Sequence, residues 1–187
     1  MGFMASEGPD ELAGSVMAWQ LMESRVVHSA PSFEVRTDSV VGADGQLDRY
    51  SHVVAPGSVT VLAIDENDSV VLALKWIYTH GGSQWRLPGG VLKQTDAEPV
   101  AAARRELAVT GLRASNWREL GTIHGADSVS NHVDHLFLAT GLTGNPCGRV
   151  HRMPFAEAVA LVRTGRIPHA GSGYALLRVA LDRATGS

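Results

Sequence analysis

Apolar residues along this chain gather in short runs separated by polar turns, and these runs predict most of the secondary structure. Runs of the length and composition of β-strands lie at residues 24–28, 33–41, 59–64, 69–76, 117–123 and 134–140. Asp44-Gly45 and the polar segment 65–68 each predict a hairpin turn. The polar stretch 125–132 predicts a loop before the last of these strands.

A different spacing predicts a helix over residues 97–110. Val100, Ala103 and Leu107 follow an i, i+3, i+7 repeat, which places them on one helical face. Asp96 is the expected N-cap, and Gly111 is the expected stop. Two further segments, 154–164 and 172–184, have periodic apolar residues and predict helices.

Strands interspersed with helices in 187 residues predict one globular domain of α/β (α+β) class. The first fifteen residues are small and polar, so we expect disorder there and a single domain over residues 16–187. The segment 18–50 would supply the amino-terminal strands of that domain.

Composition narrows the function classes. A net charge of −3 and a pI near 6.2 give no basic footprint for nucleic acid. No apolar run approaches the roughly 20 residues that a membrane helix needs. The single Cys147 excludes an intramolecular disulfide and fits a reducing compartment, so we expect a cytoplasmic protein.

The most informative segment is Trp85-Arg86-Leu87-Pro88-Gly89-Gly90, followed by Ala101–Leu107 and Thr110-Gly111. This arrangement resembles the Nudix box, G-x5-E-x7-R-E-U-x-E-E-x-G-U, in which U is a bulky aliphatic residue. Nudix hydrolases use this loop–helix–loop to hold a diphosphate through divalent metal ions. The chain keeps Arg105-Glu106-Leu107 and the closing Gly111-Leu112.

The departures from that pattern fall on metal-binding positions. With Arg105-Glu106 aligned, the first family glutamate falls at Ala97, and the Glu-Glu pair, shortened by one residue, reads Val109 or Thr110. A hard cation such as Mg²⁺ binds oxygen ligands, commonly carboxylates. With Glu106 alone on that helix face, the resemblance implies weakened or altered catalysis, and ligands drawn from elsewhere if metal is bound.

The wider order of elements resembles the ADP-ribose pyrophosphatase branch of the Nudix superfamily from about residue 19 to residue 181. The resemblance implies a mixed β-sheet sandwiched between helices and a homodimer formed through the amino-terminal strands, here around 19–41. Where many members of the branch have Gln-Tyr-Arg, this chain has Lys75-Trp76-Ile77. Arg86 stands where they have a glutamate before Leu-Pro, and His132 stands where their loop carries a glutamate proposed to act in catalysis.

The resemblance assigns a role to each candidate site residue. Glu106 and the Gly89 carbonyl would bind Mg²⁺ or Mn²⁺, and Arg105 would orient the helix carboxylates. Gly90 would let the backbone approach a phosphate. Trp76, Trp85 and Arg86 would contact a nucleotide-type ligand. The alternatives are an ion pair for Glu106, a surface position for Arg105, a tight turn for the glycines and core packing for the tryptophans.

His132 has an ordinary pKa near 6.5 and is a candidate general base. His124, His132 and His135 lie around the predicted loop with Asp127 and Asp134, and a histidine metal site there is an alternative. Three functions remain open. They are metal-assisted pyrophosphate hydrolysis of a nucleoside diphosphate derivative (ADP-ribose or nucleotide-sugar type), nucleotide binding without turnover, and a repurposed enzyme using His132 or Asp127 in acid–base chemistry.

Overall fold

The computed structural model describes residues 19–186, which form two compact units divided after Val54. The expectation of disorder over residues 1–15 lies outside the described residues. The first unit is an antiparallel sheet in the order β1 (Gln20–Ala30), β2 (Phe33–Val41) and β3 (Leu47–Val54). The predicted turn at Asp44-Gly45 joins β2 to β3, and Gly45 has a φ of 76°.

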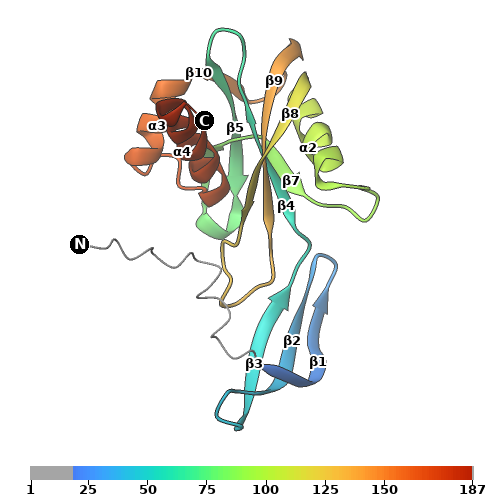
Figure 1. The fold of residues 1–187 in the computed structure, drawn as a ribbon. Coiled ribbons are helices and arrows are strands. Elements are labelled where there is room, and N and C mark those ends of the chain that lie inside the picture. The colour runs from blue at the N-terminus through green and yellow to red at the C-terminus, as the bar shows by residue number, and fades with distance from the viewer. Residues whose placement is uncertain (1–18, 187) are drawn as a thin grey trace, which may run out of the picture. The chain divides into compact units, whose positions relative to one another are not determined.

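The second unit, from Ala55, is built on two small sheets (Figure 1). One has the order β7-β4-β9-β8 and the other the order β10-β5-β6. The strands are β4 (Ser58–Ala63), β5 (Ser69–Ile77), β6 (Gly82–Arg86), β7 (Gly89–Val91), β8 (Leu112–Ile123), β9 (Asp134–Gly144) and β10 (Val150–Pro154). The helices are η1 (Tyr78–His80), α2 (Pro99–Ala108), α3 (Phe155–Arg163) and α4 (Ala170–Thr185).

Alternating side chains of β4 and β9 bury both faces of the first sheet. Val59, Val61 and Ala63 pack with Ala103 and Leu107 of α2. The intervening positions of β4 and β9 join a second cluster on the other face, made with α4: Leu62, Ile64, Leu136, Ala175, Leu176 and Val179. Because successive strand residues point to opposite faces, this alternation places α2 and α4 on opposite sides of the sheet. The predicted mixed sheet between helices is confirmed.

The hairpin predicted at residues 65–68 is not a paired hairpin. β4 and β5 belong to different sheets and share only the bridge between Ile64 and Val70. Both edges of β4 are already taken, since β7 pairs on one side and β9, in parallel, on the other. The short strands β6, β7 and β10 were not predicted because each is too brief or too rich in polar residues and glycine for its own signal.

The box helix is confirmed in position but begins later than predicted. Its N-cap is Glu98, whose side chain makes no capping hydrogen bond, and Pro99 occupies the first turn. Asp96 was wrongly predicted as the cap, because its carboxylate instead accepts from the Lys93 N–H at 2.7 Å and pairs with Arg105. Gly111 has a φ of 81° and follows the helix, with its N–H donating to the Ala108 carbonyl. None of the helices within residues 19–186 has the length and apolar character needed to cross a membrane.

His169 caps α4 and ties it to the box loop. The Ser172 N–H donates to His169 Nδ1 at 3.3 Å, and the Leu87 N–H donates to the Ser172 hydroxyl at 3.0 Å. Nδ1 therefore acts as an acceptor, which requires a neutral imidazole. Burial lowers the pKa of His169, and the charge of Arg86 lowers it further.

This arrangement predicts a pH-dependent stability. Because the folded state favours neutral His169, its capping contribution is present above the unfolded pKa of about 6.5 and is lost as the pH falls through the lowered folded pKa. An N-cap contributes about 1 kcal/mol. Between pH 8 and pH 5, the free energy of unfolding in urea should fall less in His169→Asn than in the unaltered protein. Asparagine keeps a capping acceptor and has no titrating ring. The exposed-site control His80→Asn should behave as the unaltered protein. Equal drops in all three proteins would contradict the assignment.

Candidate active site

The box loop lies tightly against the central strand. Gly89 of β7 pairs with Thr60 of β4, and a Cβ at Gly89 would lie 2.3 Å from the Val59 carbonyl oxygen. No side chain fits at that distance, so glycine is required for this approach. Leu87, two residues earlier, is buried in the core next to α4. The loop is thus fixed on both sides, and its backbone is positioned before any ligand binds.

Glu106 of α2 reaches the next residue of this loop. A Cβ at Gly90 would lie 2.5 Å from the carboxyl carbon of Glu106 and 2.5 Å from one of its oxygens. The carboxylate therefore occupies the space that any other residue at position 90 would need. The sequence predicted that the backbone at Gly90 approaches a phosphate, and in this structure the group beside Gly90 is the Glu106 carboxylate.

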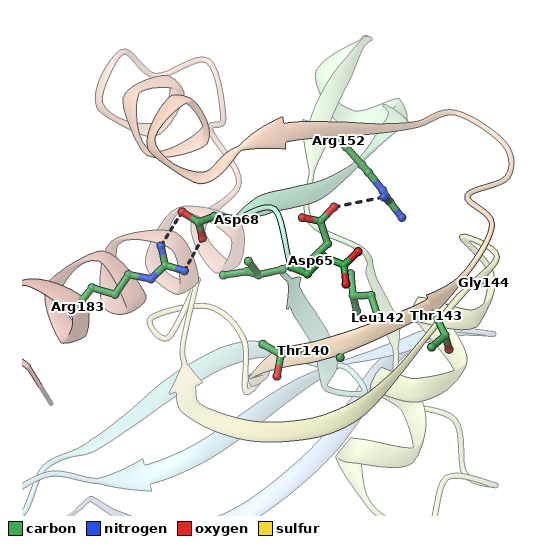
Figure 2. Close-up of a pocket in the computed structure, with 11 residues that line it drawn as sticks. Asp65, Asp68, Thr140, Leu142, Thr143, Gly144, Arg152 and Arg183 are labelled. Carbon is green, nitrogen blue, oxygen red and sulfur yellow. Dashed lines mark hydrogen bonds and ion pairs between the residues drawn. The ribbon is translucent and has the colours of Figure 1, made fainter.

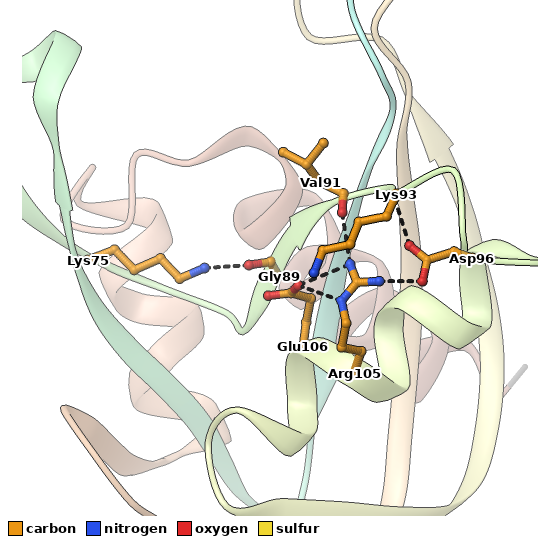
Figure 3. A network of polar contacts seen from close by, with 7 residues as sticks. All are labelled: Lys75, Gly89, Val91, Lys93, Asp96, Arg105 and Glu106. Carbon is orange, nitrogen blue, oxygen red and sulfur yellow. Dashed lines mark hydrogen bonds and ion pairs between the residues drawn. The ribbon is translucent and has the colours of Figure 1, made fainter. Parts of the chain in front are cut away.

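Arg105 joins the acidic groups around the loop (Figure 3). Its guanidinium donates to Glu106 at 3.2 and 3.3 Å, to the Val91 carbonyl at 2.9 Å and, at short range, to Asp96. The hydrogen bond from Arg105 holds the pKa of Asp96 below its usual range, and Asp96 in turn raises the pKa of Arg105. Arg105, predicted to orient the helix carboxylates, contacts one carboxylate of α2, that of Glu106. Asp96, one position before the aligned Ala97, provides its acidic partner.

Lys75 of β5 approaches the same loop from the opposite side. Its ammonium donates a hydrogen bond to the Gly89 carbonyl, and Figure 3 shows the side chain extending toward that oxygen. Burial lowers the pKa of Lys75, while the negative charge of Glu106 acts in the opposite direction. The carbonyl predicted as a metal ligand is thus already the acceptor for a cationic side chain.

A divalent cation does not fit the donors that these residues present. Mg²⁺ needs near-octahedral oxygen coordination, usually with one or two carboxylates free to bind. Glu106 is held by Arg105, and Gly89 by Lys75. Within residues 19–186, no three His, Cys, Asp or Glu side chains gather in a group that could hold a metal ion. His124, His132 and His135, considered from the sequence as an alternative metal site, form no such group either.

Two cations line a small cavity beside the loop. It has a volume of about 230 Å³ and is bordered by Lys75 and Arg86 together with polar and backbone groups of Ser58, Thr60, Gly89, Gly90 and His169. No carboxylate is among its lining residues. Arg86 donates through Nε and one terminal nitrogen to Gln84 Oε1, at 3.1 and 2.8 Å, which fixes the guanidinium plane. The cavity therefore has the charge and the donors to bind an anion.

His132 lies in the loop before β9, where both ring nitrogens have partners. Nδ1 donates to the Pro56 carbonyl at 2.8 Å, and Nε2 is 3.0 Å from the Ser58 hydroxyl. That hydroxyl donates to the buried Asp134 at 2.7 Å, and the Thr60 hydroxyl donates to the same carboxylate at 2.8 Å. Ser58 stands between the histidine and the acid, so this is not the order of a nucleophilic triad, in which the base lies between them.

The two tryptophans have different surroundings. Trp76 is 64% exposed near the end of β5, where a ligand ring has access to it. Trp85 packs against the core cluster that contains Leu87, and its ring lies 5.7 Å from that of His151. Trp85 thus contributes to the packing of β6, the alternative considered for it from the sequence.

A larger cavity, of about 730 Å³, lies elsewhere, along the turn after β4 and the end of β9 (Figure 2). Its two arginines are each paired with a carboxylate. Arg152 contacts Asp65 at 3.3 Å, and Arg183 contacts Asp68 at 2.7 Å while stacking over Phe155. These pairs hold the turn against β10 and α4.

A family comparison agrees with this geometry. The model of the NUDIX domain matches residues 55–164, more than half of the chain. The chain belongs to the Nudix family. The matched region begins where the second compact unit begins, and it contains the box loop, α2, Lys75 and His132.

Relatives place this Nudix chain among hydrolases. It is 30% identical over 170 residues to the CMP-5'-(N-acetyl-N-hydroxy-3-aminopropyl)phosphonate hydrolase of Streptomyces rubellomurinus, covering 87% of this chain and 82% of the relative. It is also 30% identical over 159 residues to the ADP-ribose pyrophosphatase of Mycobacterium tuberculosis, covering 80% and 77%. The predicted resemblance to a Nudix hydrolase of the ADP-ribose pyrophosphatase type is confirmed.

A solved structure shows the same fold. The crystal structure of an ADP compounds hydrolase superposes with a TM-score of 0.79 at 18% identity, and the match covers 92% of this chain and 98% of the other. At that identity the similarity establishes the fold alone.

Sequence reasoning did not assign a site role to Lys75, although a signal was present. The strand reads Ser-Val-Val-Leu-Ala-Leu-Lys-Trp-Ile, in which one lysine interrupts an apolar run. A charged residue in such a strand requires a polar partner, since burial without one is costly. No comparable signal in the sequence marks the other polar lining residues, Ser58, Thr60 and His169. Only the tertiary fold brings their side chains to the cavity.

The close approach at Gly90 yields a testable coupling. Gly90→Ala should destabilise the protein by about 1–3 kcal/mol in urea unfolding, because the new methyl group displaces the Glu106 carboxylate. In a Glu106→Ala background the same change should cost much less, since the obstructing group is gone. Gly125→Ala, whose Cβ would meet no atom within 4 Å, is the matched control and should change stability by less than about 0.5 kcal/mol. Additive effects of the two substitutions would refute the contact.

Proposed function

We propose that this Nudix domain hydrolyses the pyrophosphate linkage of a nucleoside diphosphate derivative, of the ADP-ribose or nucleotide-sugar type, at a low rate. The observation that carries the proposal is the cavity lined by Lys75 and Arg86 beside the box loop. Its charge suits a diphosphate. The two hydrolases with which the chain shares 30% identity have names that specify nucleotide-linked substrates.

The reaction needs few protein groups. Water forms a bond to one phosphorus, the bridging P–O bond breaks, and the second phosphate leaves with the remainder of the substrate. The water proton passes to a carboxylate or to solvent. Negative charge on the phosphoryl oxygens would be stabilised by the Lys75 ammonium and the Arg86 guanidinium, since fixed charges aimed at developing charge lower the barrier. Trp76, exposed at the end of β5, is available to stack on the base or sugar.

A low rate follows from the donors on α2. Val109 and Thr110 stand where the Nudix pattern has its paired glutamates, and Glu106 is already engaged by Arg105. Nudix hydrolases generally use divalent metals, and the weak Mg²⁺ or Mn²⁺ site expected at Glu106 lacks the carboxylates that such chemistry employs. Loss of charge-stabilising groups near a reacting phosphate removes several kcal/mol, and each ~1.4 kcal/mol is tenfold in rate.

Turnover should depend on Glu106. Among ADP-ribose, nucleotide sugars, dinucleoside polyphosphates and CMP-linked phosphonates, the best substrate should turn over well below the ~10 s⁻¹ typical of enzymes. Glu106→Gln should lower that rate at least about tenfold, because the substitution removes the charge that orients Arg105 and faces Lys75. Phosphate or nucleotide release, followed by chromatography with and without chelator, measures both effects.

Each other outcome selects a different function. Cleavage of ADP-ribose near 10 s⁻¹ would refute the weakened catalysis. Tight binding of ADP with no turnover of any substrate would identify a nucleotide-binding module. Loss of activity in His132→Ala, with no effect of chelator, would identify a repurposed acid–base site in that loop.

We also propose that the first unit mediates homodimerisation. Ten of the eleven residues of β1 are exposed, and a three-stranded sheet with uncovered strands is a template for pairing. Large apolar side chains on this unit are exposed, which marks it as an interaction surface: Trp19, Leu21, Met22, Val26, Val27, Leu47 and Tyr50. A second copy of the same chain is the occupant that the resemblance to the ADP-ribose pyrophosphatase branch implies. We place this homodimer in the cytoplasm, where the exposed free Cys147 would stay reduced.

Sedimentation equilibrium tests the dimer directly. At micromolar concentration the protein should sediment with twice the chain mass of 19.9 kDa. The interface of such a dimer should bury upwards of about 2,000 Å². Leu21→Lys with Val27→Lys should give a monomer, because two charges would be buried unpaired in the interface. Leu177→Lys with Leu181→Lys, which alters exposed leucines of α4, should leave the dimer intact. A monomeric unaltered protein would refute the proposal.

A further inference from the structure

The position at which the Nudix box would present metal ligands is occupied by a side chain of the protein itself. Lys75 extends from β5 across to β7, and its ammonium donates to the Gly89 carbonyl (Figure 3). Glu106, the remaining box carboxylate, acts on the same ammonium through its charge. A carbonyl and a carboxylate facing one cation form the kind of environment that a bound metal ion would also have.

The charged side chains of this network carry a positive excess without an external ion. Lys75, Lys93 and Arg105 contribute three positive charges, and Asp96 and Glu106 contribute two negative ones. A divalent cation added to this set would raise that excess and would compete with Lys75 for the Gly89 oxygen. The lysine therefore fits a helix that lacks the glutamates of the Nudix pattern. With so few carboxylates, the ammonium of Lys75 supplies positive charge that a metal ion would otherwise bring.

We propose that Lys75 is a resident cation that replaces the divalent metal of this Nudix site, so that a diphosphate group binds to Lys75 and Arg86 without metal. This inference rests on the proposed function and specifies how that site recognises its substrate. The cavity that both cations line has a volume of about 230 Å³. That is below the ~300–1,000 Å³ of pockets that enclose a whole drug-sized ligand, and it suits a phosphate or diphosphate group whose organic parts lie outside.

Lys75 and Arg86 would contact the anion in different ways. Lysine carries a compact point charge on a flexible stem, so it can contact a backbone oxygen and a phosphate oxygen with different protons of one ammonium. Arg86, held in its plane by Gln84, presents its remaining N–H groups in fixed directions. The pair combines one adaptable and one oriented donor for the same anion.

The first experiment measures anion binding by calorimetry, with inorganic pyrophosphate as the probe. The dissociation constant should be the same in EDTA and in excess Mg²⁺, and Lys75→Met should raise it at least about tenfold under both conditions. Arg166→Met, which removes an exposed positive charge outside the cavity lining, is the matched control and should bind as the unaltered protein. Binding that appears only with Mg²⁺, or that survives Lys75→Met, would overturn the inference.

The second experiment asks whether the lysine excludes a metal. Lys75→Gln, which places at this position the residue of the ADP-ribose pyrophosphatase branch, frees the Gly89 carbonyl and removes one positive charge from the network. Its affinity for Mn²⁺, followed by electron paramagnetic resonance, should rise at least about tenfold over that of the unaltered protein. A second substitution, Glu106→Gln, should abolish the gain. Equal Mn²⁺ affinities in the unaltered and Lys75→Gln proteins would contradict the replacement.

The two proposals fail in different ways. Turnover of a nucleotide substrate that requires Mg²⁺ and survives Lys75→Met would uphold the hydrolase and refute Lys75 as its cation. Metal-independent pyrophosphate binding that needs Lys75, with no turnover of any nucleotide substrate, would uphold the resident cation and refute the hydrolysis. Circular dichroism of each variant checks that the substitution leaves the fold intact, and the Lys75→Gln variant tests the inference with a different readout.

Discussion

The site depends on the close approach of β7 to β4. Gly89 lies so near the Val59 carbonyl that no side chain fits between them. Because the strand is held there, the Gly89 carbonyl is directed toward Lys75, and the space beside Gly90 is left for the Glu106 carboxylate. The buried Leu87 holds the preceding turn in the core, so the loop cannot move away from the sheet without exposing it. Two glycines and one leucine thus determine where the side chains of Lys75 and Glu106 meet the loop.

Much of the fold could be predicted from sequence, because the buried apolar residues recur with the period of the helix or strand that holds them. Val100, Ala103 and Leu107 revealed α2, and the apolar runs revealed β4, β5 and β9. Strand pairing was harder to predict, because the partners of one strand depend on where all the other strands lie. β4 and β5 follow each other in sequence with a plausible turn, yet β4 has both edges occupied by β7 and β9. No property of residues 59–76 alone contains that information.

The candidate site was predictable where the residues lie in one motif, and less so elsewhere. Glu106, Arg105, Gly89 and Gly90 come together in the structure as the box pattern implied. The assignment of Asp96 as a cap was wrong because its carboxylate binds the guanidinium of Arg105 and the Lys93 N–H, and the helix begins after Glu98. Lys75 and His169 arrive from β5 and from the start of α4, so their positions beside the loop depend on the tertiary fold.

Charge compensation connects the degenerate box to the rest of the site. A lone Glu106 near a tightly packed loop needs a counter-charge, since desolvating a carboxylate without one is costly. Arg105 supplies part of that compensation and is itself shared with Asp96. Lys75 supplies more from across the loop, and its partial burial is tolerated because the Gly89 oxygen and the Glu106 charge are both in place. Removing any one of these charges alone leaves its partners less well compensated. With lysine at position 75 of β5, the protein itself supplies both a counter-charge for Glu106 and a donor for the Gly89 oxygen.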